Sequence, residues 1–199
     1  MLNPLQKKKK FSNRPGLVLG FHGTDETVVR DVVLRQRNLL ASNNDWDWIG
    51  HGIYFWEYSP SRALEYAIAA SRRRGSVIKT PAVVGAVIDL GHCLDLLDYE
   101  KLLVVKQNYE DIKHRLGPNL PENLPSQADS QELHLRFLDC AVIQAVHDTN
   151  AAGRLPSYDS VKAVFWEGTL LYPNAGFREK NHIQICVRNP ACIKGFFIP

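Results

Sequence analysis

The pattern of apolar and polar positions along the 199-residue chain indicates a mixed α/β fold. Short apolar stretches rich in β-branched and aromatic residues predict strands, and these are expected at 17–24, 49–55, 81–90, 160–166, 182–188 and 191–198. Apolar residues at helical spacing predict helices, and these are expected from 24–26 onward, at 61–74, at 95–116 and at 131–151. Strands and helices do not alternate regularly, so a doubly wound parallel sheet is not expected.

One domain is the expectation for the main part of the chain, because 45% of the residues are hydrophobic, enough for one sizeable core. Residues 1–15 are polar and are expected to form a flexible arm, and residues 16–199 the single domain. The arm holds the basic run Lys7 to Lys10, and a second run is Arg72 to Arg74. Both runs are interpreted either as solvated surface or as contacts to nucleic acid or ligand phosphates, and the arm tilts slightly towards nucleic acid.

The sequence argues against a membrane protein, a secreted protein, a metal site and two common nucleotide-binding motifs. No apolar run reaches the roughly 18 residues of a membrane span. No apolar stretch follows the first lysines as in a signal peptide, so a cytoplasmic protein without a membrane partner is expected. The four cysteines form no C-x-x-C pair and no zinc-like spacing with histidine, so no metal is expected. Neither a Gly-x-Gly-x-x-Gly after a strand nor a Walker A sequence is present.

Candidate chemistry gathers in the first third of the chain. His22 and Thr24 place polar side chains on either side of Gly23, which lets a ligand approach the backbone. Tyr54 and Tyr66 offer two aromatic faces, and a flat cationic ring held there would gain about 1–2 kcal/mol when desolvated. Together these residues indicate a pocket for nicotinamide and its ribose. The alternative for each of them is plain packing in the core or at the surface.

Three motifs carry a resemblance to a known family. They are His22-Gly23-Thr24, Gly50-His51-Gly52-Ile53-Tyr54-Phe55 and Ser61-Arg62-Ala63-Leu64-Glu65-Tyr66. In this order they resemble the ADP-ribosyltransferase superfamily, in its branch of diphtheria toxin and the poly(ADP-ribose) polymerases, which has a His-Tyr-Glu triad spread over three strands. The spacing from Tyr54 to Tyr66 is one residue longer than in that family. The resemblance covers residues 17–90 well and 160–198 weakly.

The resemblance implies a fold and a ligand. The fold would be a split β-sandwich of two small sheets with flanking helices, and the uncovered residues 95–155 would be a helical insertion. NAD would lie in the cleft between the sheets as a co-substrate, and no metal would be needed.

The resemblance also implies roles for single residues. Gly23 would pair through its backbone with the nicotinamide carboxamide, and the Thr24 hydroxyl would support it. His22 would hydrogen-bond the adenosine ribose. Tyr54, as the triad tyrosine, and Tyr66 would stack on the nicotinamide ring.

The third motif departs from the family, which places its glutamate on a late strand after a mobile loop. Alignment of the closing strands puts Gln184 at that position, where a glutamine can accept a hydrogen bond from the ribose but supplies no negative charge. Glu179, on the preceding loop, is the second candidate for the position, and Glu167 is a further nearby carboxylate. Arg35 after the first helix would lie near the adenylate or phosphates, and Gly52 belongs to the cofactor-binding second motif.

The sequence therefore predicts an NAD-dependent mono-ADP-ribosyltransferase that acts on a protein or nucleic acid, because the missing glutamate argues against polymer synthesis. The compact form suggests a bacterial toxin or phage-defence effector, with a neutralising antitoxin as an expected partner. Two alternatives stay open: an NAD glycohydrolase on the same fold, and a non-catalytic module that binds NAD, ADP-ribose or nucleic acid. His51 is a candidate acceptor contact, and Trp46 and Trp48 either line the cleft or anchor their loop.

Overall fold

The computed structural model describes residues 17–126 and 132–199, and the arm expected at 1–15 lies outside these ranges. The strands within them are β1 (Leu17–Asp25), β2 (Ile53–Glu57), β3 (Pro81–Asp89), β4 (Cys93–Asp95), β5 (Ser160–Phe165), β6 (His182–Val187) and β7 (Ile193–Phe197). The helices are α1 (Glu26–Val33), α2 (Pro60–Ser71), α3 (Tyr99–Leu116) and α4 (Phe137–Ala152), with 3₁₀ turns at Gly117–Asn119 and Pro190–Cys192.

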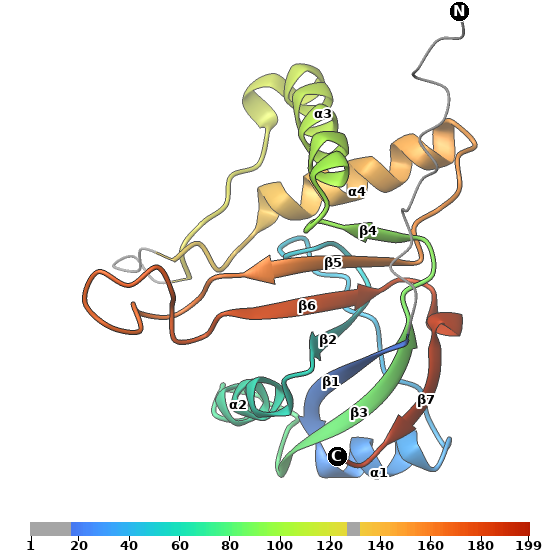
Figure 1. Ribbon diagram of the computed structural model, residues 1–199, viewed down its shortest axis with the longest axis vertical. Helices are drawn as coiled ribbons and strands as arrows, with labels where there is room; N and C mark the ends of the chain where they lie inside the picture. Colours follow the sequence, from blue (N-terminus) through green and yellow to red (C-terminus); the bar gives the residue numbers. More distant parts are fainter. Residues whose placement is uncertain (1–16, 127–131) are drawn as a thin grey trace, which may run out of the picture.

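All seven strands of the described residues are joined by hydrogen bonds into one sheet, in the order β4-β5-β6-β2-β1-β3-β7 (Figure 1). Neighbouring strands are antiparallel except β4 and β5. β1 pairs with β3 along its whole length but with β2 only at Gly20–Glu57 and Phe21–Trp56. The sheet is therefore narrow in its middle, between a limb of β4, β5, β6 and β2 and a limb of β1, β3 and β7. The mixed α/β class is confirmed, and the hydrogen bonds form one sheet rather than two.

Different helices cover the two faces of this sheet. On one face, which we call the α1 face, Val32 of α1 packs into a core with Phe55 of β2. On the opposite face, the α2 face, Ala63 of α2 packs against Phe21 and Trp56. Phe21 and Trp56 are direct cross-strand partners, and such partners point to the same face.

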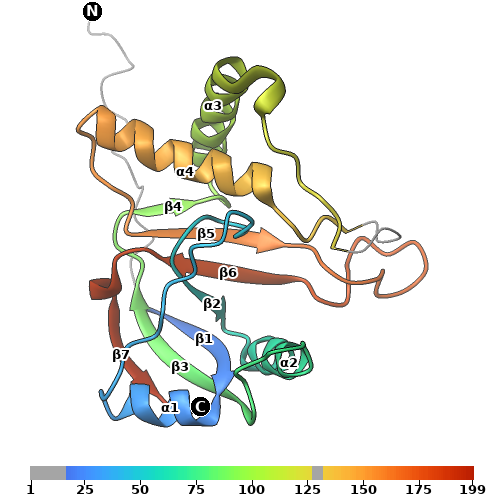
Figure 2. The same cartoon turned by 180° about the vertical axis from the view of Figure 1, so that it is seen from behind.

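The helix α4 covers the rest of the α2 face, above β4, β5 and β6, and α3 packs against α4. The long connection from α1 to β2 runs past the sheet to α4 (Figure 2). There the rings of Trp46 and Phe137 lie edge to face with centroids 5.9 Å apart, and the Cys140 thiol donates to the backbone oxygen of Asn44. The helices of residues 95–155 thus form part of the cover of the sheet.

The start of α1 is fixed by the carboxylate of Asp25. It accepts hydrogen bonds from the backbone nitrogens of Thr80 and Lys79 at 2.9 and 2.7 Å, and from the backbone and hydroxyl of Thr27. These donors hold the pKa of Asp25 well below its usual range. One side chain therefore caps α1 and ties it to the segment that enters β3.

The elements differ from the expected ones in four places. The helix α3 begins at Tyr99 rather than at residue 95, which ends β4. The strand β4 was not predicted, because three residues carry too little pattern. The strand β2 begins at Ile53 rather than at residue 49, since the four residues before it form a turn. The helix α4 begins at Phe137, several residues later than expected.

Lys162 and Glu57 form a buried ion pair on the α1 face, with 2.7 Å between Lys162 Nζ and Glu57 Oε1 and side chains that are 6% and 8% exposed. We predict that Lys162→Met lowers the free energy of unfolding by about 3–5 kcal/mol, because Glu57 stays buried without its counter-charge. The double variant Lys162→Met with Glu57→Leu should recover most of this loss, since both charges are gone. Urea denaturation at neutral pH measures both, and a single-variant loss below about 1 kcal/mol would contradict the prediction.

Candidate functional site

The three motif positions lie on neighbouring strands in the middle of the sheet. His22 is on β1, Tyr54 on β2 and Gln184 on β6, and β2 lies between the other two. Side chains alternate between the faces along each strand. Tyr54 and Gln184 lie on the α2 face, because Trp56 pairs directly with Gln184. His22 lies on the α1 face, with its ring centroid 5.8 Å from that of Phe55, so the structure brings two of the three positions to one face.

His22 is a link between β1 and β2. Its Nδ1 lies 2.7 Å from the backbone oxygen of Tyr54, and burial lowers its pKa. A neutral ring that donates from Nδ1 to this carbonyl keeps Nε2 as an acceptor. The bond lies beside the short β1–β2 ladder, so His22 holds the strand that carries Tyr54.

Tyr54 is held by the turn that precedes β2. Its hydroxyl donates to the backbone oxygen of Gly50 at 2.6 Å and accepts from the backbone nitrogen of Ile49 at 3.1 Å. Its ring packs into the core beneath α4, and burial raises its pKa. The hydroxyl is therefore already used by the protein. Gly52 nearby has no room for a side chain, because an added Cβ would lie 2.5 Å from Cys186 Sγ.

The other residues singled out by sequence do not gather at one place. An added Cβ at Gly23 would lie 2.0 Å from the backbone oxygen of Ala63, so β1 packs directly on the backbone of α2. Thr24 is half-buried on the α1 face. Arg35 is exposed just beyond α1, with a φ of 57°, and Glu179 is exposed on the loop between β5 and β6. Of these four residues, only Gly23 lies against the helix that carries Tyr66.

Tyr66 lies at one end of a row of rings on the α2 face. It is 40% exposed, and its ring centroid is 5.1 Å from that of Trp56. The centroid distance from Trp56 to His182 is 6.2 Å, from His182 to Phe165 5.5 Å and from Phe165 to Trp48 4.8 Å. We call these five residues the aromatic row. It runs from α2 across β2, β6 and β5, with Tyr66 as its exposed end, whereas Trp56 and His182 are buried.

Polar atoms beside the aromatic row lack partners. Nε1 of Trp56, Nε of Arg62 and Nε2 of His182 are buried and have no hydrogen-bond partner in the part of the chain that the structure describes. His182 Nδ1 lies 2.6 Å from the backbone oxygen of Lys180, and burial lowers its pKa. A neutral His182 then keeps Nε2 as an acceptor, while the other two atoms are donors. Each such unpaired group costs about 1–3 kcal/mol, and a ligand with matching groups would remove this cost.

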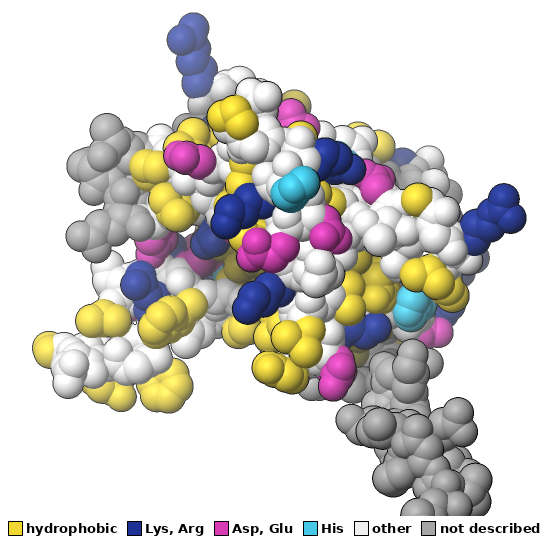
Figure 3. All heavy atoms as spheres, turned by 90° about the horizontal axis from the view of Figure 1, so that it is seen from above, with side chains coloured by type: hydrophobic (Ala, Val, Ile, Leu, Met, Phe, Trp, Pro, Cys, Tyr) yellow, Lys and Arg dark blue, Asp and Glu magenta, His cyan; other side chains and the backbone are white. Residues whose placement is uncertain are grey.

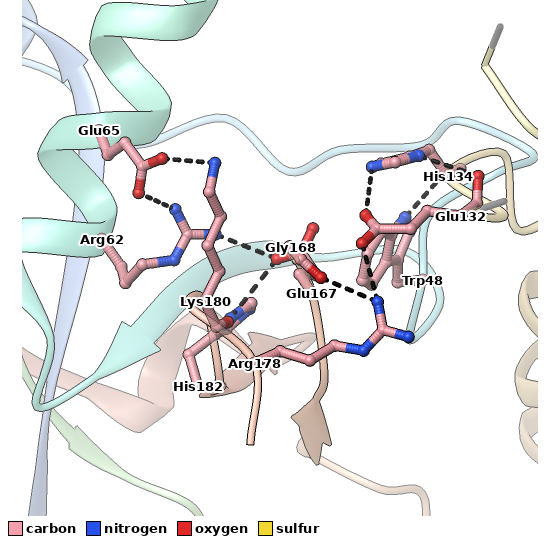
Figure 4. A network of polar contacts seen from close by, with 10 residues as sticks. All are labelled: Trp48, Arg62, Glu65, Glu132, His134, Glu167, Gly168, Arg178, Lys180 and His182. Atoms are coloured by element: carbon pink, nitrogen blue, oxygen red, sulfur yellow. Dashed lines mark hydrogen bonds and ion pairs between the residues drawn. The ribbon is translucent and has the colours of Figure 1, made fainter. Parts of the chain in front are cut away.

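Charged side chains lie beside His182, a member of the aromatic row (Figure 4). Arg62 pairs with Glu65 on its own helix and, at 3.0 Å, with Glu167 just after β5. His182 Nδ1 lies 3.5 Å from the same Glu167 carboxylate. With a side chain that is only 18% exposed, Glu167 is the carboxylate directed at the row, whereas Glu179 faces solvent.

Trp56 and Arg62 are candidates that the motifs did not single out. Both had a signal in the sequence: Trp56 shares a strand face with Tyr54 two residues earlier, and Arg62 lies one helical turn before Tyr66. The contact between Glu167 and His182 had no signal in the sequence, because the loop that separates these two residues carries no regular pattern.

Neither a metal cluster nor a membrane span occurs in residues 17–126 and 132–199. No three side chains of His, Cys, Asp or Glu in these ranges are placed to hold a metal ion. No helix there is both long and apolar enough to cross a membrane.

The chain is similar to a protein of the archaeon Methanocaldococcus jannaschii that is described as an uncharacterized protein. The two are 26% identical over 196 residues, which cover 87% of this chain and 83% of the archaeal protein. No protein-family model matches the chain, and no solved structure does. The function is therefore argued from the site itself.

We predict that Tyr54→Phe lowers the free energy of unfolding by about 1–3 kcal/mol, because Gly50 and Ile49 lose the hydroxyl partner of their backbone groups while the ring stays. Urea denaturation of variant and wild type measures this loss. Tyr172→Phe, at a tyrosine that is 54% exposed, is the matched control and should change stability by less than about 0.5 kcal/mol. Equal stability of the two variants would show that the Tyr54 hydroxyl does not hold the turn.

Proposed function

We propose that the protein is an NAD-dependent mono-ADP-ribosyltransferase and that NAD lies along the aromatic row. The observation that carries this proposal is the set of buried, unpaired polar atoms of Trp56, Arg62 and His182 beside the exposed ring of Tyr66. NAD has the complementary groups: a planar cationic ring, ribose hydroxyls and phosphate oxygens. The resemblance of the motifs selects NAD among planar nucleotides.

The sheet supports the same proposal. The resemblance implies a split sandwich with the triad spread over three strands. Here β1, β2 and β6 are neighbours, and the β1–β2 ladder is short. We infer that the narrow middle of the sheet corresponds to the split of that fold and that NAD lies on its α2 side.

The reaction would break the bond between the nicotinamide nitrogen and C1′ of its ribose, and both electrons of this bond would leave with neutral nicotinamide. Positive charge then develops at the sugar, as in glycoside cleavage. A nucleophilic atom of the acceptor supplies the electron pair for the new bond to C1′ and loses a proton. NAD and acceptor thus give ADP-ribosylated acceptor, nicotinamide and one proton.

Five residues take the main roles in this proposal. Tyr66 and Trp56 hold the nicotinamide ring, whose positive charge favours an aromatic face. His182 Nε2 accepts a hydrogen bond from a ribose hydroxyl, and the Gln184 amide binds the same ribose. Glu167 supplies negative charge near C1′ and takes the proton of the acceptor.

A binding module without activity is the second candidate. Gln184 stands where the family has a carboxylate, and Arg62 pairs with Glu167 at 3.0 Å. Such a module would bind NAD or ADP-ribose and release no nicotinamide. An NAD glycohydrolase, with water in place of the macromolecular acceptor, would release nicotinamide and label nothing.

We predict that Tyr66→Ala weakens NAD binding by about 5–30-fold, because roughly 1–2 kcal/mol of interaction with the nicotinamide ring is lost. Isothermal titration calorimetry measures the Kd. Tyr99→Ala, at a tyrosine on α3 that is 70% exposed, is the matched control and should bind NAD as the wild type does. Unchanged binding by Tyr66→Ala, or no binding by the wild type, would contradict the proposed position of NAD.

Activity is read from nicotinamide release and from labelled ADP-ribose in the protein and nucleic-acid fractions of a cell lysate. Glu167→Gln should lower the release by about 10²-fold or more, since the base is lost. Release with label supports the transferase, and release without label supports the glycohydrolase. NAD binding without release in any condition leaves the binding module.

A further inference from the structure

A pocket adjoins the aromatic row at Trp48. It has a volume of about 190 Å³ and lies between the loop after β5 and the segment that precedes α4. We call it the tryptophan pocket, and its walls include Trp48, Glu132, Arg136, Trp166, Glu167 and Arg178. Trp48 belongs to the aromatic row and Glu167 to the proposed NAD site. A group held in this pocket is therefore next to the proposed position of the ribose.

Each tryptophan of the pocket has an arginine stacked on it. The guanidinium carbon of Arg136 lies 4.7 Å from the ring centroid of Trp48, and that of Arg178 lies 5.1 Å from the centroid of Trp166. Arg178 is also held by Glu132 at 3.2 Å. The Nε atoms of both arginines are buried and have no partner within the described ranges. Both side chains are thus held over a tryptophan ring at the wall of the pocket.

Two carboxylates complete the pocket. Glu132 is held by Arg178 and, at 3.2 Å, by His134 Nε2, and the backbone oxygen of His134 accepts from Trp48 Nε1 at 2.9 Å (Figure 4). Glu167 is the second carboxylate. Carboxylates accept hydrogen bonds from exocyclic amino groups, and guanidinium groups donate to ring nitrogens and carbonyls of bases. Aromatic faces stack on any base, so this combination is suited to a nucleobase.

The loop after β5 extends the same surface outward. Figure 3 shows hydrophobic side chains along this projecting loop. Its large apolar side chains are between 46% and 58% exposed: Trp166, Leu170, Leu171, Tyr172 and Phe177. The same loop carries Arg178 and Lys180; Phe177 precedes Arg178 directly, and Arg178 stacks on Trp166. Aromatic faces next to cations bind successive bases of a single strand with little sequence preference.

We propose that the tryptophan pocket binds an unpaired base of single-stranded nucleic acid and that this base is the acceptor of ADP-ribose. A base inside a duplex does not fit, because its faces and edge are covered until it leaves the stack. This inference rests on the proposed function. An exocyclic amino nitrogen of the base bonds to C1′ as the bond to nicotinamide breaks, the electron pair leaves with nicotinamide, and Glu167 takes one proton from the amino group.

Fluorescence anisotropy with a labelled single strand of roughly 12 nucleotides tests this binding in the full chain, at constant salt and without NAD. Trp166→Ala should weaken binding roughly 5–100-fold, the loss expected for one stacked base. Trp46→Ala is the matched control, because Trp46 is 42% exposed and lies edge to face with Phe137 outside the pocket. It should bind as the wild type does. The same strand in a duplex should bind at least about 10-fold more weakly.

Equal binding of the single strand by wild type and Trp166→Ala would overturn the proposal, and so would equal binding of duplex and single strand. Label from NAD in the protein fraction alone would also overturn it. Failure of the proposed function gives a different result. The protein would then bind the single strand through Trp166 but would neither bind NAD nor release nicotinamide. In that case the pocket binds a base, and the base is not an acceptor of ADP-ribose.

Discussion

The narrow junction between β1 and β2 is the constraint on which the rest of the site depends. The two limbs of the sheet are joined there by a very short ladder that includes the pair Phe21–Trp56, and by the bond from His22 to the Tyr54 carbonyl. His22 is half-buried on the α1 face, so it acts on the opposite face only through the strand that it holds. A small shift of β2 would move Trp56, which lies between Tyr66 and His182 in the aromatic row.

The packing of α2 on β1 links this junction to the α2 face, on which the aromatic row lies. Gly23 lets the backbone of α2 approach β1 so closely that any side chain at this position would meet the oxygen of Ala63. Arg62 and Tyr66 project from the same helix, so the packing of α2 on β1, β2 and β3 sets their positions relative to Trp56. The glycine that sequence reasoning assigns to a carboxamide contact thus has a second, architectural role that is visible only in the folded chain.

The sequence predicts the type and order of most elements, because apolar spacing reports on burial along each strand and helix. It also singles out Tyr66, and the structure places this residue at an exposed position of α2. It does not tell which face of the sheet a residue occupies, because register follows from turns and pairing that no short motif encodes. This is why His22 and Tyr54 were expected to share one pocket. The sequence does not decide between Glu167 and Glu179, because both lie on an irregular loop whose course no pattern predicts. Glu179, the second candidate after Gln184, is exposed.

The placement of charge bears on the kind of transfer that this site would support. Gln184 on β6 can hold a ribose hydroxyl but cannot remove its proton, since an amide is not a base. Glu167, the carboxylate beside the aromatic row, also forms part of the wall of the tryptophan pocket. A general base such as Glu167 would there take a proton from an acceptor group held in the pocket. It would not take one from the ribose of an ADP-ribose that is already attached. We infer that this division between a neutral residue at the ribose and a carboxylate at the acceptor favours a single transfer over chain growth.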